Sequence, residues 1–334
     1  MSGCDLDPDP SFTGVFLMAK QPLNMIVLGL LVAALPACAP KQVPVKRSLV
    51  PVRSDLVILD GRTGDSLQWT TMIDRLGGAD VVLLGEQHND AVGHAVQLAV
   101  VEDVLDSAQG GALALEMLER DEQPLIEDYR DGIIDAKTFA KLSGSTSWSG
   151  LGSWEVWYQP IIDAAIERNA AVIAANAPRR YVRVVRSDGW ERIDALDASR
   201  RGLVDYPDTP LAGAYRDRFM DLMGGHGEDG ADTEQNEASL AIAESYFLAQ
   251  QVWDATMAAS ISTALERSGP PILLLVGRFH SDLDGGTSMQ VKRLLPAARV
   301  VSISLEPNCD VVEFDAESPQ ADLIVCTDTV TSSP

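Results

Sequence analysis

Five short apolar segments constrain the fold of this 334-residue chain more than any other feature of its sequence. They are β-branched or leucine-rich runs at 81–85, 112–116, 171–176, 272–277 and 300–305. Runs of this length and composition are typical of strands in a parallel sheet that is covered on both faces. Helical patterns at 91–106, 155–167 and 237–265 alternate with them. The alternation predicts an α/β fold with a mostly parallel, open sheet flanked by helices.

Two stretches, residues 118–158 and 180–250, do not follow that alternation. Both are helical or irregular in pattern and rich in Trp, Tyr and Arg. We interpret them as helical insertions that cap the carboxyl edge of the strands. Core and insertions together predict a single domain over residues 55–330.

The first 54 residues predict export and anchoring. An apolar run at 25–35 follows Lys20, precedes Cys38 and is too short to span a bilayer. This order is typical of a lipoprotein signal, so we expect residues 1–37 to be removed and Cys38 to be acylated. A buried core helix is the alternative interpretation of the apolar run. Residues 38–54 are polar and proline-rich, and predict a lipidated tether.

Residues 1–17 carry three aspartates, which are unusual in a signal, so we expect translation to begin at Met18. Ala39 follows the predicted lipidation site, where an aspartate would disfavour sorting to the outer membrane. We therefore expect a lipid-anchored protein of the bacterial cell envelope, held at the outer membrane.

The charge and the cysteines narrow the choice of partners and compartment. Asp and Glu number 49 against 26 Lys and Arg, for a formal net charge of −23, which argues against a nucleic-acid partner. Only Cys309 and Cys326 fall within the predicted domain. An exported protein meets an oxidising environment, so these two either form a disulfide or remain as buried thiols on neighbouring strands.

Polar side chains follow four of the five predicted strands, at the point where each strand ends. In chain order they are Glu86 and His88, Glu116, Arg179 and Arg180, and Arg278 and His280. The carboxyl ends of strands form the edge where open α/β sheets bind ligands. The sequence therefore predicts a functional site at this edge.

The two histidines at this edge share a G-x-x-H pattern that begins at Gly85 and at Gly277. With Glu86 and Glu116, they could hold a divalent metal or act as a general acid and base. The alternative is that both are hydrogen-bonded structural residues. His94 either points back at the site or is solvated, and we expect His226, in a glycine-rich loop, to be exposed.

The strand-end arginines, Arg179, Arg180 and Arg278, suggest an anionic ligand, because guanidinium groups pair well with carboxylates. Solvated arginines are the alternative. Several aromatic residues could line a pocket for a flat apolar molecule, or form a helical core, which we favour for Trp154 and Trp157. This set comprises Trp148, Trp154, Trp157, Tyr158, Tyr181 and Phe279. Tyrosines are also candidate iron ligands.

Five segments together resemble the ChaN-like haem-binding lipoproteins of the haem-binding uptake/Tiki superfamily, whose relatives include erythromycin-esterase-like and Tiki metalloprotease-like proteins. In order, they are VVLLGEQHND…HAVQ, LALEM, AANAPRRYV, AQQVWDATMA and LLLVGRFHSDLDGG. The resemblance covers roughly residues 55–305. It implies an α/β core with helical insertions and a site built from Glu86, His88, Glu116 and His280. The chain departs from the family pattern at 89–91, where the family usually has Asp-Asn and a proline.

The resemblance and the signal imply a membrane-anchored lipoprotein that binds haem or an iron or metal cofactor, for haem-iron uptake. The residues expected to contact the cofactor are His88, His94, Arg179, Arg278 and His280. An outer-membrane haem or iron receptor and a homodimer are the expected partners. A hydrolase that uses the paired G-x-x-H motifs, metal-dependent or not, on a peptide, ester or lactone is the alternative. The third possibility is a structural lipoprotein with a vestigial site.

Overall fold

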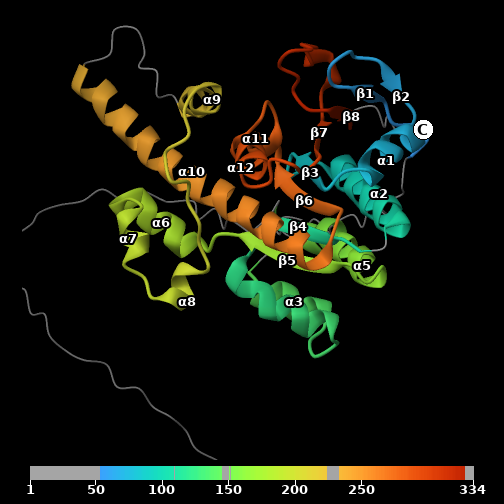
Figure 1. Cartoon of the computed structure of the whole chain (residues 1–334), viewed down its shortest axis with the longest axis horizontal. Coiled ribbons are helices and arrows are strands. Elements are labelled where there is room, and N and C mark those ends of the chain that lie inside the picture. The colour runs from blue at the N-terminus through green and yellow to red at the C-terminus, as the bar shows by residue number, and fades with distance from the viewer. Residues whose placement is uncertain (1–52, 109, 145–149, 151, 224–232, 328–334) are drawn as a thin grey trace, which may run out of the picture. The chain divides into compact units, whose positions relative to one another are not determined.

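We describe a computed structural model of the chain, which covers residues 53–108, 110–144, 150, 152–223 and 233–327 (Figure 1). All of them belong to one compact unit, residues 44–334. The signal segment, the predicted lipidation site Cys38, Trp148 and His226 lie outside the described residues. In the described part, no helix combines the length and the apolar character that crossing a membrane would require.

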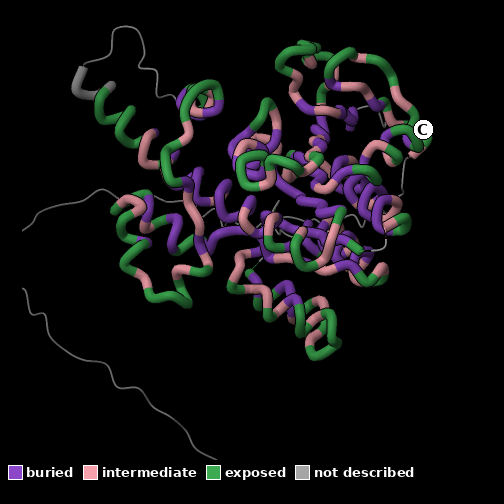
Figure 2. Tube along the Cα trace, in the orientation of Figure 1, coloured by how far each residue is buried: buried purple, intermediate pink, exposed green. Residues whose placement is uncertain are grey.

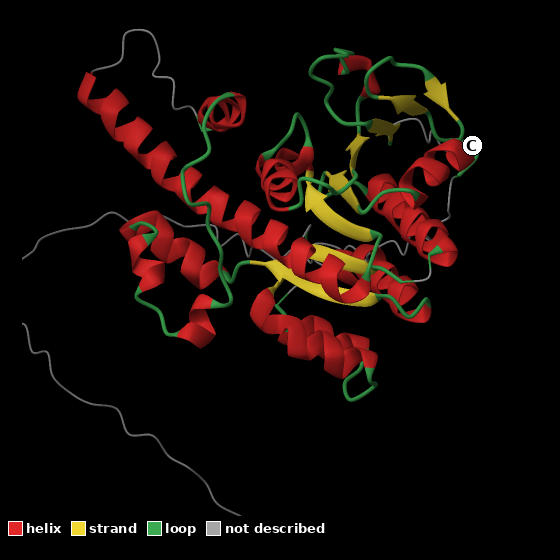
Figure 3. Ribbon diagram, in the orientation of Figure 1, coloured by secondary structure: helices red, strands yellow, loops and turns green. Residues whose placement is uncertain are grey.

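A single sheet organises the described residues, with strand order β2-β1-β8-β7-β3-β6-β4-β5 (Figure 3). The pairs β7–β8, β3–β7, β3–β6, β4–β6 and β4–β5 are parallel, whereas β1 is antiparallel to both β2 and β8. The strands are β1 (Ile58–Asp60), β2 (Ser66–Leu67), β3 (Val81–Glu86), β4 (Ala112–Glu119), β5 (Ala171–Asn176), β6 (Ile272–Gly277), β7 (Val300–Glu306) and β8 (Leu323–Cys326). The predicted α/β class and mostly parallel open sheet are confirmed.

All five predicted strands are present as β3 to β7. β4 runs three residues past its predicted end, with a shift of register against β5 between Leu115 and Glu119. The remaining three strands were not predicted, because they have only two to four residues.

The helices lie on both sides of the sheet and at its carboxyl edge. They are α1 (Trp69–Gly77), α2 (Ala91–Ser107), α3 (Gln123–Arg130), α4 (Ala136–Leu142), α5 (Gln159–Glu167), α6 (Arg179–Asp188), α7 (Glu191–Asp194), α8 (Ala198–Arg201), α9 (Ala214–Leu222), α10 (Thr233–Ser268), α11 (Arg278–Ser281) and α12 (Gly286–Leu294). A π-helical turn over Trp154–Tyr158 precedes α5, so that α5 begins four residues later than predicted.

Alternate residues of the central strands pack against two different helix layers. Val82 and Leu84 of β3 belong to a core with α1, α2 and α5, whereas Val81 and Leu83 pack with α10 and α12. Figure 2 shows these strands as continuously buried. Because successive strand side chains point to opposite faces, an unbroken apolar run is what a sheet covered on both sides requires.

The two predicted insertions occupy different places. The first supplies α3, α4 and the π-helical turn, and α3 lies beside the edge strand β5. There the Gln123 amide donates to the Val172 carbonyl at 3.0 Å and accepts from the Ala174 N–H at 2.9 Å. The second supplies α6 to α9 and the start of α10; α6, α9 and α10 line a cavity with Glu116 and Asn176 of β4 and β5.

A disulfide links the segment after β7 to the end of β8. Cys309 and Cys326 are bonded, with their Cα atoms 5.6 Å apart and 17 positions apart in the sequence. Of the two alternatives for these cysteines, the structure therefore has the disulfide. The intervening segment contains Gln320, whose backbone and side chain contact the loop after β6.

Candidate functional site

The first half of the site is a buried carboxylate that holds a histidine at the end of β3. Glu86 Oε1 lies 2.7 Å from His88 Nδ1, and the turn between them begins where β3 stops pairing with β6. The carboxylate also accepts from Tyr158 Oη at 2.7 Å and from the Gln97 amide at 2.6 Å. These contacts fix the carboxylate, and through it the orientation of the His88 ring.

The second half has the same construction at the end of β6. Asp254, from the middle of α10, is completely buried and lies 2.6 Å from His280 Nδ1. It also accepts from Tyr215 Oη at 2.6 Å and from Thr287 Oγ1 at 2.8 Å. Each half therefore has one buried carboxylate that receives an imidazole, a tyrosine hydroxyl and a third donor.

Glu116 and Gly277 lie between the two halves. Glu116 Oε2 accepts the Gly277 N–H at 2.6 Å, and Glu116 Oε1 lies 3.5 Å from His280 Nε2. A Cβ atom on Gly277 would lie 3.4 Å from His88 Nε2 and 3.5 Å from Glu116 Oε2. His88 and Glu116 therefore approach the same point. All four predicted residues, Glu86, His88, Glu116 and His280, are together at the carboxyl edge.

The surrounding carboxylates raise the proton affinity of both imidazoles. For His280, burial disfavours the charged form, but the charges of Asp254 and Glu116 outweigh it and raise the pKa to about 9. Burial also opposes the charge of His88, and the contact with Glu86 and the charge of Glu116 raise its pKa. Burial raises the pKa of Glu86, but the nearby His94 and His88 rings and Gln97 hold it below its usual range.

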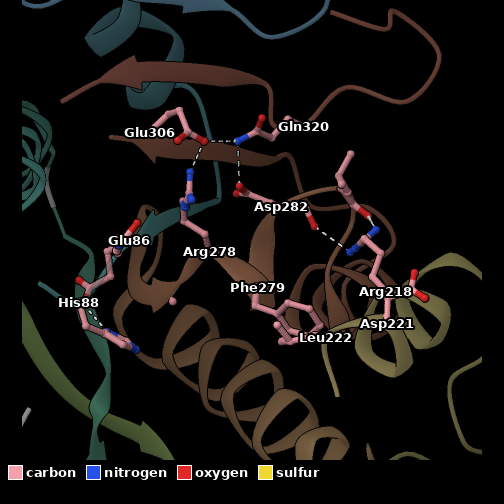
Figure 4. A pocket seen from close by; sticks show the side chains of 13 residues that line it. Glu86, His88, Arg218, Asp221, Leu222, Arg278, Phe279, Asp282, Glu306 and Gln320 are labelled. Atoms are coloured by element: carbon pink, nitrogen blue, oxygen red, sulfur yellow. Dashed lines mark hydrogen bonds and ion pairs between the residues drawn. The ribbon is translucent and has the colours of Figure 1, made fainter. Parts of the chain in front are cut away.

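Two cavities open beside this centre. The larger, of about 760 Å³, is shown in Figure 4. Its lining residues are Glu86, Gln87, His88, Arg218, Asp221, Leu222, Gly277, Arg278, Phe279, Asp282, Leu283, Glu306 and Gln320. The smaller, of about 440 Å³, is lined by Glu116, Asn176, Arg179, Val182, Arg183, Arg186, Phe219, Met223, Tyr246, Ala249, Gln250 and Trp253.

Comparison with known proteins decides the family. The model of the haem-binding uptake family ChaN, in the Tiki superfamily, matches residues 72–291, which is most of the chain. This chain belongs to the ChaN family. The match spans both dyads, by which we mean the Glu86–His88 and Asp254–His280 pairs. No curated protein sequence matches the chain.

Solved structures similar to this ChaN-family protein include ChaN of Campylobacter jejuni, whose structure was described for cofacial haem binding. The two are 19% identical, with a TM-score of 0.60 over 82% of this chain and 97% of the other. The type III effector HopBA1 is 10% identical, with a TM-score of 0.41 over 77% and 91% of the two chains. The erythromycin esterase EreC is 12% identical, with a TM-score of 0.38 over 76% and 81%.

The divalent-metal interpretation gains no support from the geometry. In residues 53–327, apart from the gaps given above, no group of three or more His, Cys, Asp or Glu side chains is arranged to hold a metal ion. The carboxylate oxygens of Glu86 are occupied by His88, Tyr158 and Gln97, and one oxygen of Glu116 by the Gly277 N–H.

His94 does not reach a ligand surface in this ChaN-family protein. Its side chain is fully buried, and its Nε2 atom donates to the His88 carbonyl at 3.1 Å while Nδ1 lies 2.8 Å from Gln97 Oε1. The ring also stacks on Trp157, 4.9 Å away. His94 therefore supports the backbone of His88, which is a positioning role rather than the predicted contact with a cofactor.

The three predicted arginines are largely neutralised by acidic neighbours. Arg278 pairs with Glu306, Arg180 with Asp121 at 2.7 Å, and Arg179 Nε lies 3.8 Å from Glu119. Arg278 lines the larger cavity and Arg179 the smaller. Arg180 lines neither cavity, and the anionic ligand inferred from these arginines stays a prediction.

Most of the predicted aromatic residues pack in the core, and one lines a cavity. Trp154 and Tyr158 are buried in the core between α2 and α5, as favoured for Trp154. Trp157 is partly buried against the same core, and Tyr181 packs in a separate cluster under α6. Only Phe279 of the described aromatic set lines either cavity.

Four residues that line or support the site were not predicted. Asp254 lies in the motif AQQVWDATMA that carried the resemblance, but an aspartate inside a long helical pattern usually marks a solvated face. Arg183 and Arg186 follow Arg179 at four and seven positions, so helical periodicity could have placed all three on one face of α6. Arg218, from α9, has no such signal.

Proposed function

We propose that this ChaN-family protein binds haem, and that the smaller cavity holds it. Family membership carries the proposal, and the cavity residues suit the ligand. Val182, Phe219 and Trp253 provide an apolar wall for a porphyrin. The arginines of α6 provide positive charge for its propionates.

A phenol in the same wall suits the iron. Arg186 donates to Tyr246 Oη at 2.7 Å and lies over the ring, 4.6 Å from its centroid. Phenolate is an established type of iron ligand in haem proteins. We therefore assign Tyr246 as the ligand to haem iron in this proposal.

Haemin titration followed by Soret absorbance tests the proposal. We expect saturable binding with a fixed stoichiometry, weakened by Arg183→Gln and altered in spectrum by Tyr246→Phe. Arg200→Gln is the matched control, because Arg200 is an exposed arginine on α8 that pairs only with Asp197 and lines neither cavity. Absence of saturable haemin binding by the unaltered protein would contradict the proposal.

We also propose that the protein is held at the outer membrane through lipid on Cys38, where it works with a receptor in haem-iron uptake, as a homodimer. The signal pattern before Cys38 and the family name support anchoring and uptake. Metabolic labelling with palmitate should label the protein but not Cys38→Ala, and sedimentation of the released protein should give twice the mass of one chain. Labelling that survives Cys38→Ala would exclude this anchor.

Hydrolysis is a second candidate function, favoured by the two carboxylate–histidine dyads. A carboxylate on Nδ1 orients an imidazole and stabilises its protonated form, as a general acid and base requires. Burial opposes the charge of His88, but the contact with Glu86 and the charge of Glu116 raise the pKa of this imidazole above its usual range. If His88 acts as the base, the rate of hydrolysis should therefore rise at a higher pH than it would with an ordinary imidazole.

Ester, lactone and peptide substrates, assayed from pH 6 to pH 10 with and without chelator, test this candidate. We expect an alkaline activity that resists the chelator and is lost in His88→Ala. A signal of equal size from His88→Ala would assign the activity to a contaminant.

A further inference from the structure

Arg218 is a half-buried cation in the wall of the larger cavity. It comes from α9, and its two terminal nitrogens donate to the backbone carbonyls of Leu283 at 3.0 Å and Asp282 at 3.1 Å. Figure 4 shows it on the opposite side of the cavity from His88. The two carbonyls fix the guanidinium in place before any ligand is bound.

Arg218 forms no ion pair with a carboxylate of the described residues, and the charges of Asp282 and Asp284 act on it only at longer range. Within the described part of the chain, no Asp or Glu oxygen lies within ion-pair distance of Arg218. The nearby Asp282 carboxylate instead accepts from Ser304 Oγ at 2.7 Å and from the Gln320 amide at 3.1 Å. By contrast, Arg216 on the same helix pairs with Glu244, and Arg278 across the cavity pairs with Glu306.

The guanidinium retains hydrogen-bonding capacity toward a ligand. An arginine carries five N–H donors, and the two carbonyl contacts account for two of them. Burial removes part of the hydration of the Arg218 charge and lowers the pKa of this guanidinium. A bound anion would therefore compensate the Arg218 charge for the hydration that burial has removed.

The cavity wall beside Arg218 is apolar. Phe279 lines the cavity and packs on Tyr215, 5.4 Å between ring centroids. Leu222 lines it too, although its side chain is 70% exposed to solvent. An exposed leucine next to an unpaired arginine is suited to a ligand that has an apolar body and an anionic group.

We propose that the larger cavity binds an organic monocarboxylate with an apolar body, whose carboxylate is held by Arg218. A carboxylate fits better than a phosphate, because among the described lining residues Arg218 is the one guanidinium without an ion pair, while Asp221 and Asp282 would repel a dianion. The apolar body then lies along Phe279 and Leu222, toward His88. This is a binding site separate from the proposed haem cavity, and it depends on neither proposed function.

Calorimetric titration of the purified protein with octanoate, octanamide and octyl phosphate tests the proposal. We expect saturable binding of octanoate, and binding of the neutral amide and of the phosphate weaker by about tenfold or more, the scale of one charge-assisted contact. Arg218→Gln should weaken octanoate binding to the same degree, and Arg218→Lys should restore part of it. Arg216→Gln is the matched control on the same helix and should bind octanoate like the unaltered protein.

Several outcomes would overturn the site. They are absence of saturable octanoate binding, equal binding of octanamide, tighter binding of octyl phosphate, and equal losses in Arg218→Gln and Arg216→Gln. Thermal melting of each variant identifies a loss of binding that is due to unfolding. If Arg218→Gln is unfolded, octanoate binding by Arg218→Lys decides whether the site exists.

Haemin titration separates the two cavities: Arg218→Gln should bind haemin normally, and Arg183→Gln should bind octanoate normally. A joint loss of both ligands in either variant would contradict two separate sites.

Discussion

At the scale of single residues, the site consists of two histidines, His88 and His280, each held by a buried carboxylate, Glu86 or Asp254. Glu86, His88, Glu116 and His280 could be predicted because each follows an apolar strand, and strand ends meet in a parallel sheet. Asp254 could not be predicted by this route, because it reaches the site from a helix that packs across the sheet. The pairing state of the arginines was also hidden, since Glu306 and Asp121 are distant in sequence from the residues that they neutralise.

The pKa of His280 gives the residue-scale prediction. Its folded-state pKa of about 9 lies above the ordinary histidine value of 6.5, so its charge stabilises the fold fully below about pH 6.5. That contribution is lost as the pH rises through about 9. Asp254→Asn should therefore lower the His280 pKa, measured by NMR titration of the imidazole Cε1–H signal and assigned with His280→Gln. A His280 pKa of 6.5 or less in the unaltered protein would contradict the prediction.

At the scale of elements, the strands were easier to predict than the helical insertions. An apolar run identifies a central strand by itself, whereas α6 to α9 depend on contacts with α10 that the sequence does not reveal. Gly286, the first residue of α12, packs closely against α10 and α9. A Cβ on Gly286 would lie 2.0 Å from Asp254 Oδ2 and 2.6 Å from Tyr215 Cε1, both in buried side chains.

Two glycine substitutions should therefore differ in their effect on stability. Gly286→Ala should destabilise the fold by about 1–3 kcal/mol, because the new methyl group has no space between α10 and α12. Gly277→Ala meets only ordinary contacts of 3.4 Å or more, and should fold with a stability close to that of the unaltered protein. Urea unfolding of both variants measures the difference. Equal losses would show that packing around Asp254 can relax.

At the scale of the whole molecule, the sheet extends further than the sequence indicates. β8 adds to β7, and the antiparallel strands β1 and β2 extend that side of the sheet. The chain also returns from β7 through a disulfide-closed segment that delivers Gln320 to the larger cavity. From the sequence, the disulfide was only one of two alternatives, the other being two buried thiols. An oxidising compartment and the spacing of the two cysteines do not determine whether they are bonded.

Removing the disulfide should affect both stability and the larger cavity. Replacing both cysteines by serine opens a loop of 17 residues and should cost about 3 kcal/mol of unfolding free energy. Hydrogen exchange should rise first in residues 309–326, which include the Gln320 contacts to Asp282 and Ser304. Urea denaturation and exchange mass spectrometry measure the two effects. Unchanged exchange in that segment would show that the contacts to β7 hold it without the covalent link.

The Gln123 side chain has a consequence for how molecules of this protein meet one another. The outer edge of β5 would otherwise present a carbonyl and an N–H to any extended peptide, which is the way in which sheets of neighbouring proteins join. Gln123 occupies both groups, and it does so with a side chain of the same domain. At these two positions the sheet is thus protected against adding a foreign strand, which guards against aggregation when many copies are crowded together.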